Sequence, residues 1–232
     1  MTTIKYKKQI LEAFSRSPYL LPGKWHNSLG IGPAYVGSRL MYSDPKMLKL
    51  FGKAIGEIAL KLPIDAICGV PSAGIPLASV VSVETKIPFL YGRKKRGAKG
   101  QRRFVEGDFR KGWRIALIED ASGSGSTKKG IIPGIKSEDL KINHIIQLFD
   151  CEVKKDPLYA RSNIKFHSLV KHSELVQYMI RTKRISKELG KLLLGVFDTD
   201  NMKWWEKEAT AKDWKDYEEL CNESNYPFFK NK

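Results

Sequence analysis

The stretch that decides the fold of this chain is IALIEDASGSGST, which runs from Ile115 to Thr127. Four apolar residues indicate a strand that ends in two acids, Glu119 and Asp120, and small residues follow before a helix begins. Small residues allow backbone N–H groups to converge on an anion, and a helix N-terminus adds its positive dipole end. The stretch therefore predicts a phosphate-binding loop at the carboxyl end of a strand, where open α/β sheets bind ligands.

The glycine spacing of this loop matches neither GxxxxGK[ST] nor GxGxxG, so neither a P-loop nor a dinucleotide-binding motif is indicated. A plain polar turn between a strand and a helix is the alternative interpretation. That alternative explains less well why two carboxylates stand immediately before the glycines. Carboxylates do not hold a phosphate, but they accept hydrogen bonds from ribose hydroxyls and ligate metal ions.

Short apolar runs on both sides of the loop indicate further strands. Together with Arg114–Ile118 they are Ile64–Val70, Ile87–Tyr91, Ile142–Phe149 and Ile164–Leu169. The segments between these strands have apolar residues at helical spacing. One such segment starts at Pro45, and Ser43 or Asp44 supplies its N-terminal cap. Nearly continuous apolar strands separated by helices are typical of a parallel sheet covered on both faces. We therefore expect a doubly wound α/β domain.

The two ends of the chain are less regular. Helices are predicted at three places outside the sheet, near Thr3–Ser15, His172–Ile180 and Ser186–Leu194. The Pro/Gly-rich stretch Pro18–Pro33 is expected to be irregular, and the tryptophan-rich tail from Asp198 onward is expected to pack as helix against the body. We therefore divide the chain into a main domain of residues 1–195, with its core at about 45–170, and a helical extension of residues 196–232.

The chain has 232 residues and a formal net charge of +16, from 41 basic and 25 acidic residues. Such a field favours an anionic partner, whether nucleic acid, an anionic membrane or a small polyphosphate. Three widely spaced cysteines without a CxxC pair indicate neither a disulfide framework nor a zinc site. The N-terminus has no signal-peptide pattern, and no run approaches the ~20 apolar residues of a membrane span, so we expect a cytoplasmic protein.

A second turn is expected beside the phosphate loop, and two such turns at adjacent strand ends suit a ligand that carries phosphates at both ends. Gly69–Pro76 is a Gly/Pro-rich turn at the end of a neighbouring strand, and a tight strand-to-helix connection is its alternative interpretation. Arg93–Arg103 is strongly basic and has no apolar face. One interpretation is a lid that closes over a polyphosphate and neutralises the leaving group. The alternatives are a nucleic-acid patch and a solvated surface loop.

In their order and spacing, these motifs resemble those of the type I phosphoribosyltransferases, and specifically the orotate phosphoribosyltransferases. The resemblance covers about Ser28 to Asp150 and continues more weakly to about Leu194. The matching segments are Gly32–Tyr35 with Arg39, Cys68–Ala78, Arg93–Lys94, Phe104–Gly107 and Leu117–Ser126. The resemblance implies transfer of phosphoribose from phosphoribosyl diphosphate (PRPP) to orotate, with Mg²⁺ as cofactor, giving orotidine 5′-monophosphate and pyrophosphate. It also implies a type I phosphoribosyltransferase fold with a small hood, and a homodimer in which the basic lid reaches the neighbouring site.

The same resemblance assigns roles to individual residues. It implies that PRPP is bound by Pro71, Ser72, Ala73, Glu119, Asp120, Ala121, Ser122, Gly123, Ser124, Gly125, Ser126 and Thr127. Within that set, Glu119 and Asp120 would hold the ribose hydroxyls directly or through a metal ion. The catalytic residues implied are Arg93, Lys94, Lys99 and Asp120. The base would be bound by Tyr35, Val36 and Cys151.

Several residues depart from the pattern of the family. Gly97 replaces a lysine of the lid, Lys99 a histidine or tyrosine, Ser72 a tyrosine, Gly123 a hydroxyl residue, and Cys151 an arginine that helps bind orotate. Because of Cys151, one alternative function is that of a phosphoribosyltransferase for another nucleobase. Gly97 and the net positive charge leave open a PRPP-fold protein that does not catalyse and that binds RNA through its lid.

Overall fold

The computed structural model describes residues 6–16, 20–27, 30–97, 100–122, 126–153, 163–224 and 226. Its main sheet has six strands in the order β5-β4-β3-β6-β7-β8. The strands are β3 (Ala66–Gly69), β4 (Phe89–Gly92), β5 (Val105–Glu106), β6 (Arg114–Ser122), β7 (Lys141–Asp150) and β8 (Lys165–Lys171). All neighbours are parallel except the antiparallel pair β4 and β5. The predicted α/β architecture with a largely parallel sheet is confirmed.

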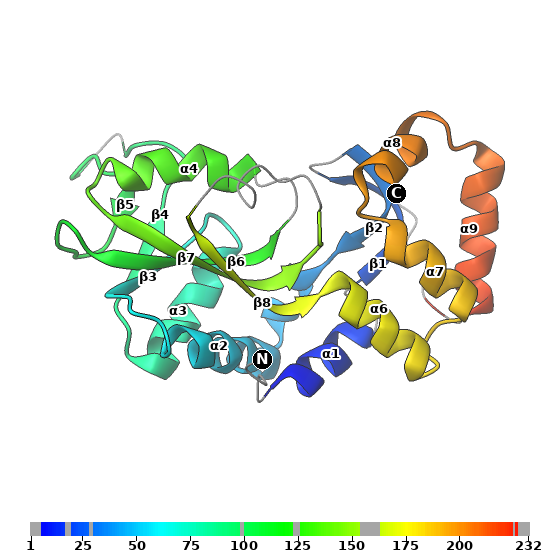
Figure 1. The fold of residues 1–232 in the computed structure, drawn as a ribbon, viewed down its shortest axis with the longest axis horizontal. Coiled ribbons are helices and arrows are strands. Elements are labelled where there is room, and N and C mark those ends of the chain that lie inside the picture. The colour runs from blue at the N-terminus through cyan, green and yellow to red at the C-terminus, as the bar shows by residue number, and fades with distance from the viewer. Residues whose placement is uncertain are drawn as a thin grey trace.

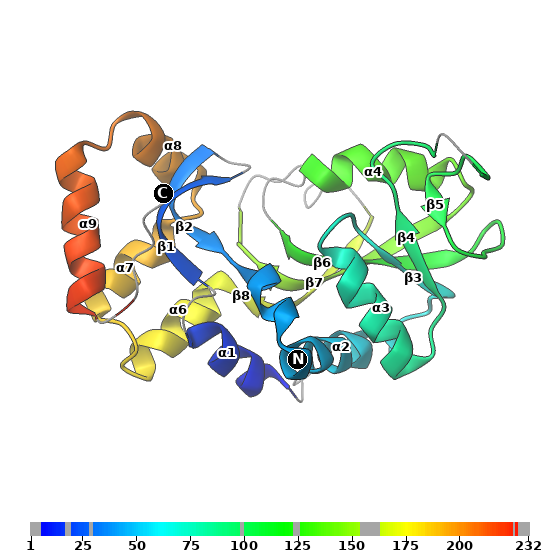
Figure 2. The same cartoon turned by 180° about the vertical axis from the view of Figure 1, so that it is seen from behind.

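Helices cover both faces of this sheet (Figure 1 and Figure 2). They are α2 (Pro45–Ala59) and α3 (Gly74–Thr85) on one face and α4 (Ser126–Lys136) on the other. Alternate residues of the central strand β6 pack on opposite faces of the sheet. Ile115 and Leu117 belong to the hydrophobic cluster that includes α4, whereas Ala116 and Ile118 belong to the cluster that includes α2 and α3. This double burial explains why the strand is apolar at every position and not at alternate ones.

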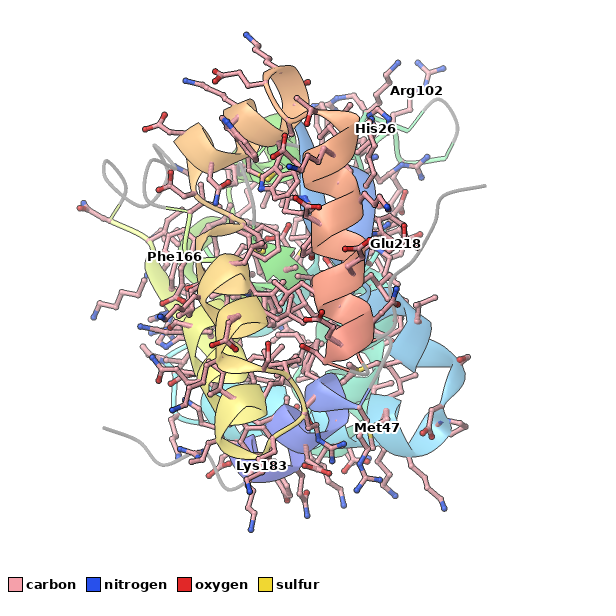
Figure 3. All side chains as sticks on the ribbon, turned by 90° about the vertical axis from the view of Figure 1, so that its right-hand side faces the viewer. His26, Met47, Arg102, Phe166, Lys183 and Glu218 are labelled. Carbon is pink, nitrogen blue, oxygen red and sulfur yellow. The ribbon has the colours of Figure 1, made fainter. Side chains whose placement is uncertain are left out.

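A second part of the molecule, which we call the hood, lies at the other end of the view in Figure 1. It consists of the hairpin β1 (Leu20–Asn27) and β2 (Gly30–Val36) with the helices α7 (Lys187–Gly195), α8 (Thr199–Lys207) and α9 (Ala211–Glu223). Figure 3 shows α7 and α9 side by side, with Glu218 on α9. The Tyr217 hydroxyl donates to the Pro33 carbonyl at 2.8 Å, and the Tyr226 hydroxyl donates to the Leu20 carbonyl at 2.8 Å. The hairpin and the C-terminal part of the described chain therefore pack into one unit.

The hairpin corrects the expectation that Pro18–Pro33 is irregular. Strand β1 pairs with β2 antiparallel, and the register shifts between Pro22 and Trp25, where Gly23 takes a φ of 148°. Prolines are tolerated in a two-stranded hairpin because each strand has an unpaired edge. The apolar pattern of the sequence also does not predict the short strand β5.

Helix boundaries follow their capping signals. The Asp44 carboxylate accepts from the backbone N–H of Lys46 at 2.8 Å and of Met47 at 3.4 Å, so Asp44 is the N-cap of α2 and Pro45 opens the helix. The N-terminal helix α1 spans Lys7–Ser15, and its predicted beginning at Thr3 lies outside the described residues. The predicted helices after β8 are confirmed as α6 (His172–Arg181) and as α7.

Glu12 of α1 joins the N-terminal helix to α6 and the turn after it. Its carboxylate accepts from the Tyr178 hydroxyl at 2.6 Å, Arg184 Nη2 at 2.7 Å and Arg16 Nε at 2.8 Å. The hydrogen bond from Tyr178, the one from Arg16 and the charge of Arg184 lower the pKa of Glu12 from 4.5 to about 2. A carboxyl group with a lowered pKa stabilises the folded chain above its ordinary pKa, and this stabilisation is lost as the pH falls through the folded-state pKa.

We therefore predict that the stabilising effect of Glu12 disappears between pH 4.5 and about pH 2. Urea unfolding of the natural chain and of Glu12→Gln, measured at several pH values, checks this. The natural chain should have the higher free energy of unfolding above pH 4.5, and the difference should close as the pH approaches 2. A difference that stays constant across this range would contradict the prediction.

Candidate active site

The predicted site segments meet along the carboxyl edge of the sheet. Parallel β6 lies between β3 and β7, so the turn after Gly69, the acids of β6 and Cys151 after β7 lie at neighbouring strand ends. Glu119 and Asp120 are almost completely buried there, with 7% and 9% of their surface exposed. Two carboxyl groups are therefore held at the edge where α/β sheets bind their ligands.

Asp120 is held from a second element, the 3₁₀ helix η1 (Ser38–Ser43) that follows β2. The buried Ser38 hydroxyl donates to Asp120 Oδ2 at 3.1 Å, and Arg39 Nε donates to the same oxygen at 3.3 Å. Burial acts against the charged guanidinium, but Asp120, Tyr35 and Tyr42 together outweigh it, and the pKa of Arg39 is raised. The carboxylate is thus fixed in one orientation by a hydroxyl and a cation.

The same short helix holds the predicted pyrophosphate turn. The hydroxyl of Tyr42 donates to the Ala73 carbonyl at 3.0 Å. Burial, and then the nearby Asp120, raise the pKa of Tyr42, so its hydroxyl keeps the proton that it donates. Helix η1 therefore contacts both the carboxylate end and the turn of the candidate site. The sequence resemblance includes Arg39 without assigning it a role, and nothing in the sequence singles out Ser38 or Tyr42.

The turn itself packs tightly against β6. The Val70 N–H donates to the Ile118 carbonyl at 3.0 Å, and the Gly74 N–H donates to the Val70 carbonyl at 2.9 Å. A Cβ atom at Gly74 would lie 2.0 Å from the Ile118 carbonyl oxygen, so only glycine allows this approach. The peptide bond between Pro71 and Ser72 is cis. Ser72 is exposed at the rim of the turn, and Ala73 is buried beneath it.

The predicted phosphate loop connects β6 to α4, as expected. Ala121 is half-buried at the end of β6. Residues 123–125, which include Gly123, Ser124 and Gly125, lie outside the described residues. Ser122 ends β6, and Ser126 and Thr127 begin α4, but their side chains are also outside the description. Their contact with phosphate stays a prediction.

The basic segment continues β4 and β5 beyond the sheet. Arg93 forms an ion pair with Glu106 of β5 at 2.7 Å. Farther out, the Gly97 N–H donates to the Arg103 carbonyl at 3.1 Å, and the guanidinium of Arg96 stacks on the ring of Phe104 at 5.0 Å. These contacts join the part of the segment that follows β4 to the part that precedes and forms β5. They also give Arg93 and Arg96 partners within this region.

One of the predicted lid cations, Lys94, is available to a ligand. Lys94 is exposed and has no carboxylate partner among the described residues. Lys99 lies outside the described residues. Their predicted catalytic role, and that of Arg93, stays a prediction.

The residues predicted for the base lie on the hood side and after β7. The Tyr35 ring stacks on Trp25 with centroids 5.4 Å apart, which fixes its orientation on β2. Val36 and Cys151 are buried and belong to the same hydrophobic cluster, and Cys151 has only 8% of its surface exposed. The position that carries an arginine in the resembled family therefore holds a buried neutral side chain in this chain.

Comparison with known proteins agrees with this geometry. The chain is 28% identical to the orotate phosphoribosyltransferase of Caenorhabditis elegans over 158 residues, which cover 67% of this chain and 70% of that protein. It is 31% identical to the uridine 5′-monophosphate synthase of Bos taurus over 159 residues, which cover 67% of this chain and 33% of that protein. The solved structure of Leishmania donovani UMP synthase superposes with a TM-score of 0.71 at 23% identity, covering 82% of this chain and 43% of that chain.

The chain thus spans less than half of the two synthases. No protein-family model matches it. The sheet order, the buried acids at the end of β6 and the turn pressed against them define a type I phosphoribosyltransferase fold. Within that class, the sequence relatives make the chain a homologue of the orotate phosphoribosyltransferases.

Proposed function

We propose that the chain transfers the phosphoribosyl group of PRPP to orotate, giving orotidine 5′-monophosphate and pyrophosphate. The observation that carries this proposal is the short helix η1. It fixes Asp120 through Ser38 and Arg39, and it fixes the neighbouring turn through the contact of Tyr42 with Ala73. A carboxylate for ribose hydroxyls therefore stands beside a turn suited to one of the phosphate-bearing ends of PRPP.

In the proposed reaction the bond between C1′ and the pyrophosphate oxygen breaks, and the base nitrogen bonds to C1′ while its proton passes to the departing pyrophosphate or to water. The ribosyl group passes through an oxocarbenium-like state. Glu119 and Asp120 accept hydrogen bonds from the ribose hydroxyls and offset the positive charge that develops on the sugar. The departing pyrophosphate lies along Pro71–Ala73, where cations such as Lys94 offset its charge.

Magnesium fits this arrangement as a cofactor shared with the substrate. No group of three His, Cys, Asp or Glu side chains among the described residues is arranged to hold a metal ion. Mg²⁺ does not require such a group, because it usually keeps several waters and binds through one or two carboxylates and substrate phosphates. Among the described residues, Ser38 and Arg39 donate to Oδ2 of Asp120, so Oδ1 would be the oxygen that accepts from a ribose hydroxyl or a magnesium-bound water. The ion would supply charge neutralisation for pyrophosphate.

The proposal includes a homodimer in which the exposed basic segment closes over the site of the other subunit. A cytoplasmic location is also proposed, since Cys68, Cys151 and Cys221 are all buried thiols, which suits a reducing compartment. Burial raises the pKa of the Cys68 thiol to about 12, which disfavours its reactive thiolate. Among the described helices, none combines the length and the apolar character that a bilayer crossing requires.

A direct assay tests the proposed reaction. We expect pyrophosphate release when the purified chain receives orotate, PRPP and Mg²⁺, and loss of that release when a chelator removes the metal. Adenine, guanine and uracil serve as alternative acceptors in the same assay. Release with one of these bases but not with orotate would reject orotate transfer and favour the other-base alternative, which the buried Cys151 keeps open. PRPP binding without turnover of any of these bases would reject the proposal that the chain is an enzyme.

A further inference from the structure

We infer that Arg39 recognises an anionic group on the acceptor base, next to the nitrogen that receives the ribose. The inference rests on the proposed function and names the class of base, a pyrimidine with a carboxylate beside the attacking nitrogen. It assigns to a residue of η1 the charge recognition that Cys151 cannot provide. Cys151 has no positive charge to offer a carboxylate, and it lies in a buried apolar cluster.

The chemistry of orotate fixes where the recognising cation has to be. Its carboxylate is attached to the ring carbon adjacent to N1, and N1 forms the bond to C1′. The carboxylate therefore lies beside the ribose in the product and in the transition state. A residue that pairs with it has to be a close neighbour of the residue that holds the ribose hydroxyls, which is Asp120 in the proposed reaction.

Arg39 is in that position. Its Nε donates to Asp120 Oδ2 at 3.3 Å, so the planar guanidinium extends from the ribose carboxylate itself. Among the described residues, this is the hydrogen bond that Arg39 makes, and 57% of its side chain is exposed. Its two terminal nitrogens can therefore donate to a ligand. A guanidinium fork matches a carboxylate in a bidentate arrangement that lysine cannot reproduce.

The position of Arg39 is fixed before the ligand arrives. Its neighbours on η1, Ser38 and Met41, are fully buried, and Tyr42 is hydrogen bonded to Ala73. Tyr35, which is predicted to flank the base, is close enough to influence the ionisation of Arg39. A ligand group presented by such a fixed element binds without a large cost of ordering the protein.

Arg39 also removes an electrostatic conflict. Glu119 and Asp120 would repel an anionic base that approaches C1′, because like charges at close range repel each other. A guanidinium placed on Asp120 offsets one of these charges and attracts the base. A neutral base has no such requirement, so Arg39 is expected to select for the carboxylate.

The test compares two substitutions that both disturb Asp120. Arg39→Gln removes the guanidinium, and Ser38→Ala removes the other hydrogen bond to the same carboxylate oxygen. In steady-state assays with PRPP and Mg²⁺, both variants should raise the KM for PRPP. Only Arg39→Gln should also raise the KM for orotate, by about 10- to 100-fold, as expected for a lost charge-assisted pair. Arg39→Lys should recover only part of that loss.

Equal effects of the two variants on the KM for orotate would overturn the inference about Arg39. The proposed function would still stand in that case if the natural chain turns over orotate. Calorimetry with orotate and uracil on the PRPP-loaded chain further distinguishes failure of the inference from failure of the proposed function. Orotate binding that Arg39→Gln weakens at least tenfold, with uracil binding unaffected, would support the inference even if the natural chain does not turn over orotate. Circular dichroism melting of both variants checks that they are folded.

Discussion

Replacing Asp120 with asparagine is expected to lower turnover by about 10²- to 10³-fold, the size of effect seen when one preorganised electrostatic group is removed from an active site. Asparagine keeps the shape of the side chain but removes its charge. It also offers an NH₂ group to Ser38 and Arg39, which both donate to Asp120 Oδ2. Steady-state kinetics with orotate and PRPP measure the loss, and the decrease should appear in kcat as well as in kcat/KM.

Asp65→Asn is the matched control for this substitution. Asp65 also pairs with an arginine, accepting from Arg114 Nε at 3.1 Å and from Arg114 Nη2 at 3.1 Å. This pair lies at the amino end of β6, at the edge of the sheet opposite the candidate site. Asp65→Asn should therefore leave turnover within about twofold of the natural chain, since surface ion pairs contribute little. Equal losses in the two variants would mean that Asp120 acts only through folding.

The sequence predicts the sheet well because each strand carries its own signal. Strand β6 is apolar at successive positions, since Ile115 and Ala116 face different clusters, and Asp44 with Pro45 marks the start of α2 without reference to the rest of the fold. The hairpin β1–β2 has no comparable local signal. Contacts from residues 184 and 206 positions away in the chain, Tyr217 to Pro33 and Tyr226 to Leu20, help to hold it.

The same distinction explains what the sequence shows of the site. Glu119 and Asp120 could be singled out because they stand next to the glycines of the loop, and local order is enough to notice them. Ser38 contacts Asp120 across 82 positions, and Tyr42 contacts Ala73 across 31. Neither residue belongs to a recognisable motif. Side chains that position a site from another element become visible only when the fold brings the elements together.

Gly74→Ala is expected to destabilise the chain and to remove PRPP binding together. The added Cβ would lie 2.0 Å from the Ile118 carbonyl oxygen, well inside contact distance. That oxygen cannot move away easily, because it accepts from the Val70 N–H at 3.0 Å in the middle of the sheet. Helix α3 and the turn before it must shift instead. Overpacking of this kind costs about 1–3 kcal/mol and sometimes more, which denaturant unfolding measures.

Gly130→Ala provides the control for this glycine. Gly130 is exposed in α4, and a Cβ there meets nothing within 4 Å, so alanine should stabilise the helix by up to about 1 kcal/mol. Calorimetry with PRPP, performed where Gly74→Ala is still folded, separates the two consequences of the substitution. Loss of PRPP binding by the folded variant would show that the turn has to press against β6 to bind the ligand. Natural stability and natural PRPP affinity in Gly74→Ala would contradict the packing of α3 on β6, and with it the position of the pyrophosphate turn.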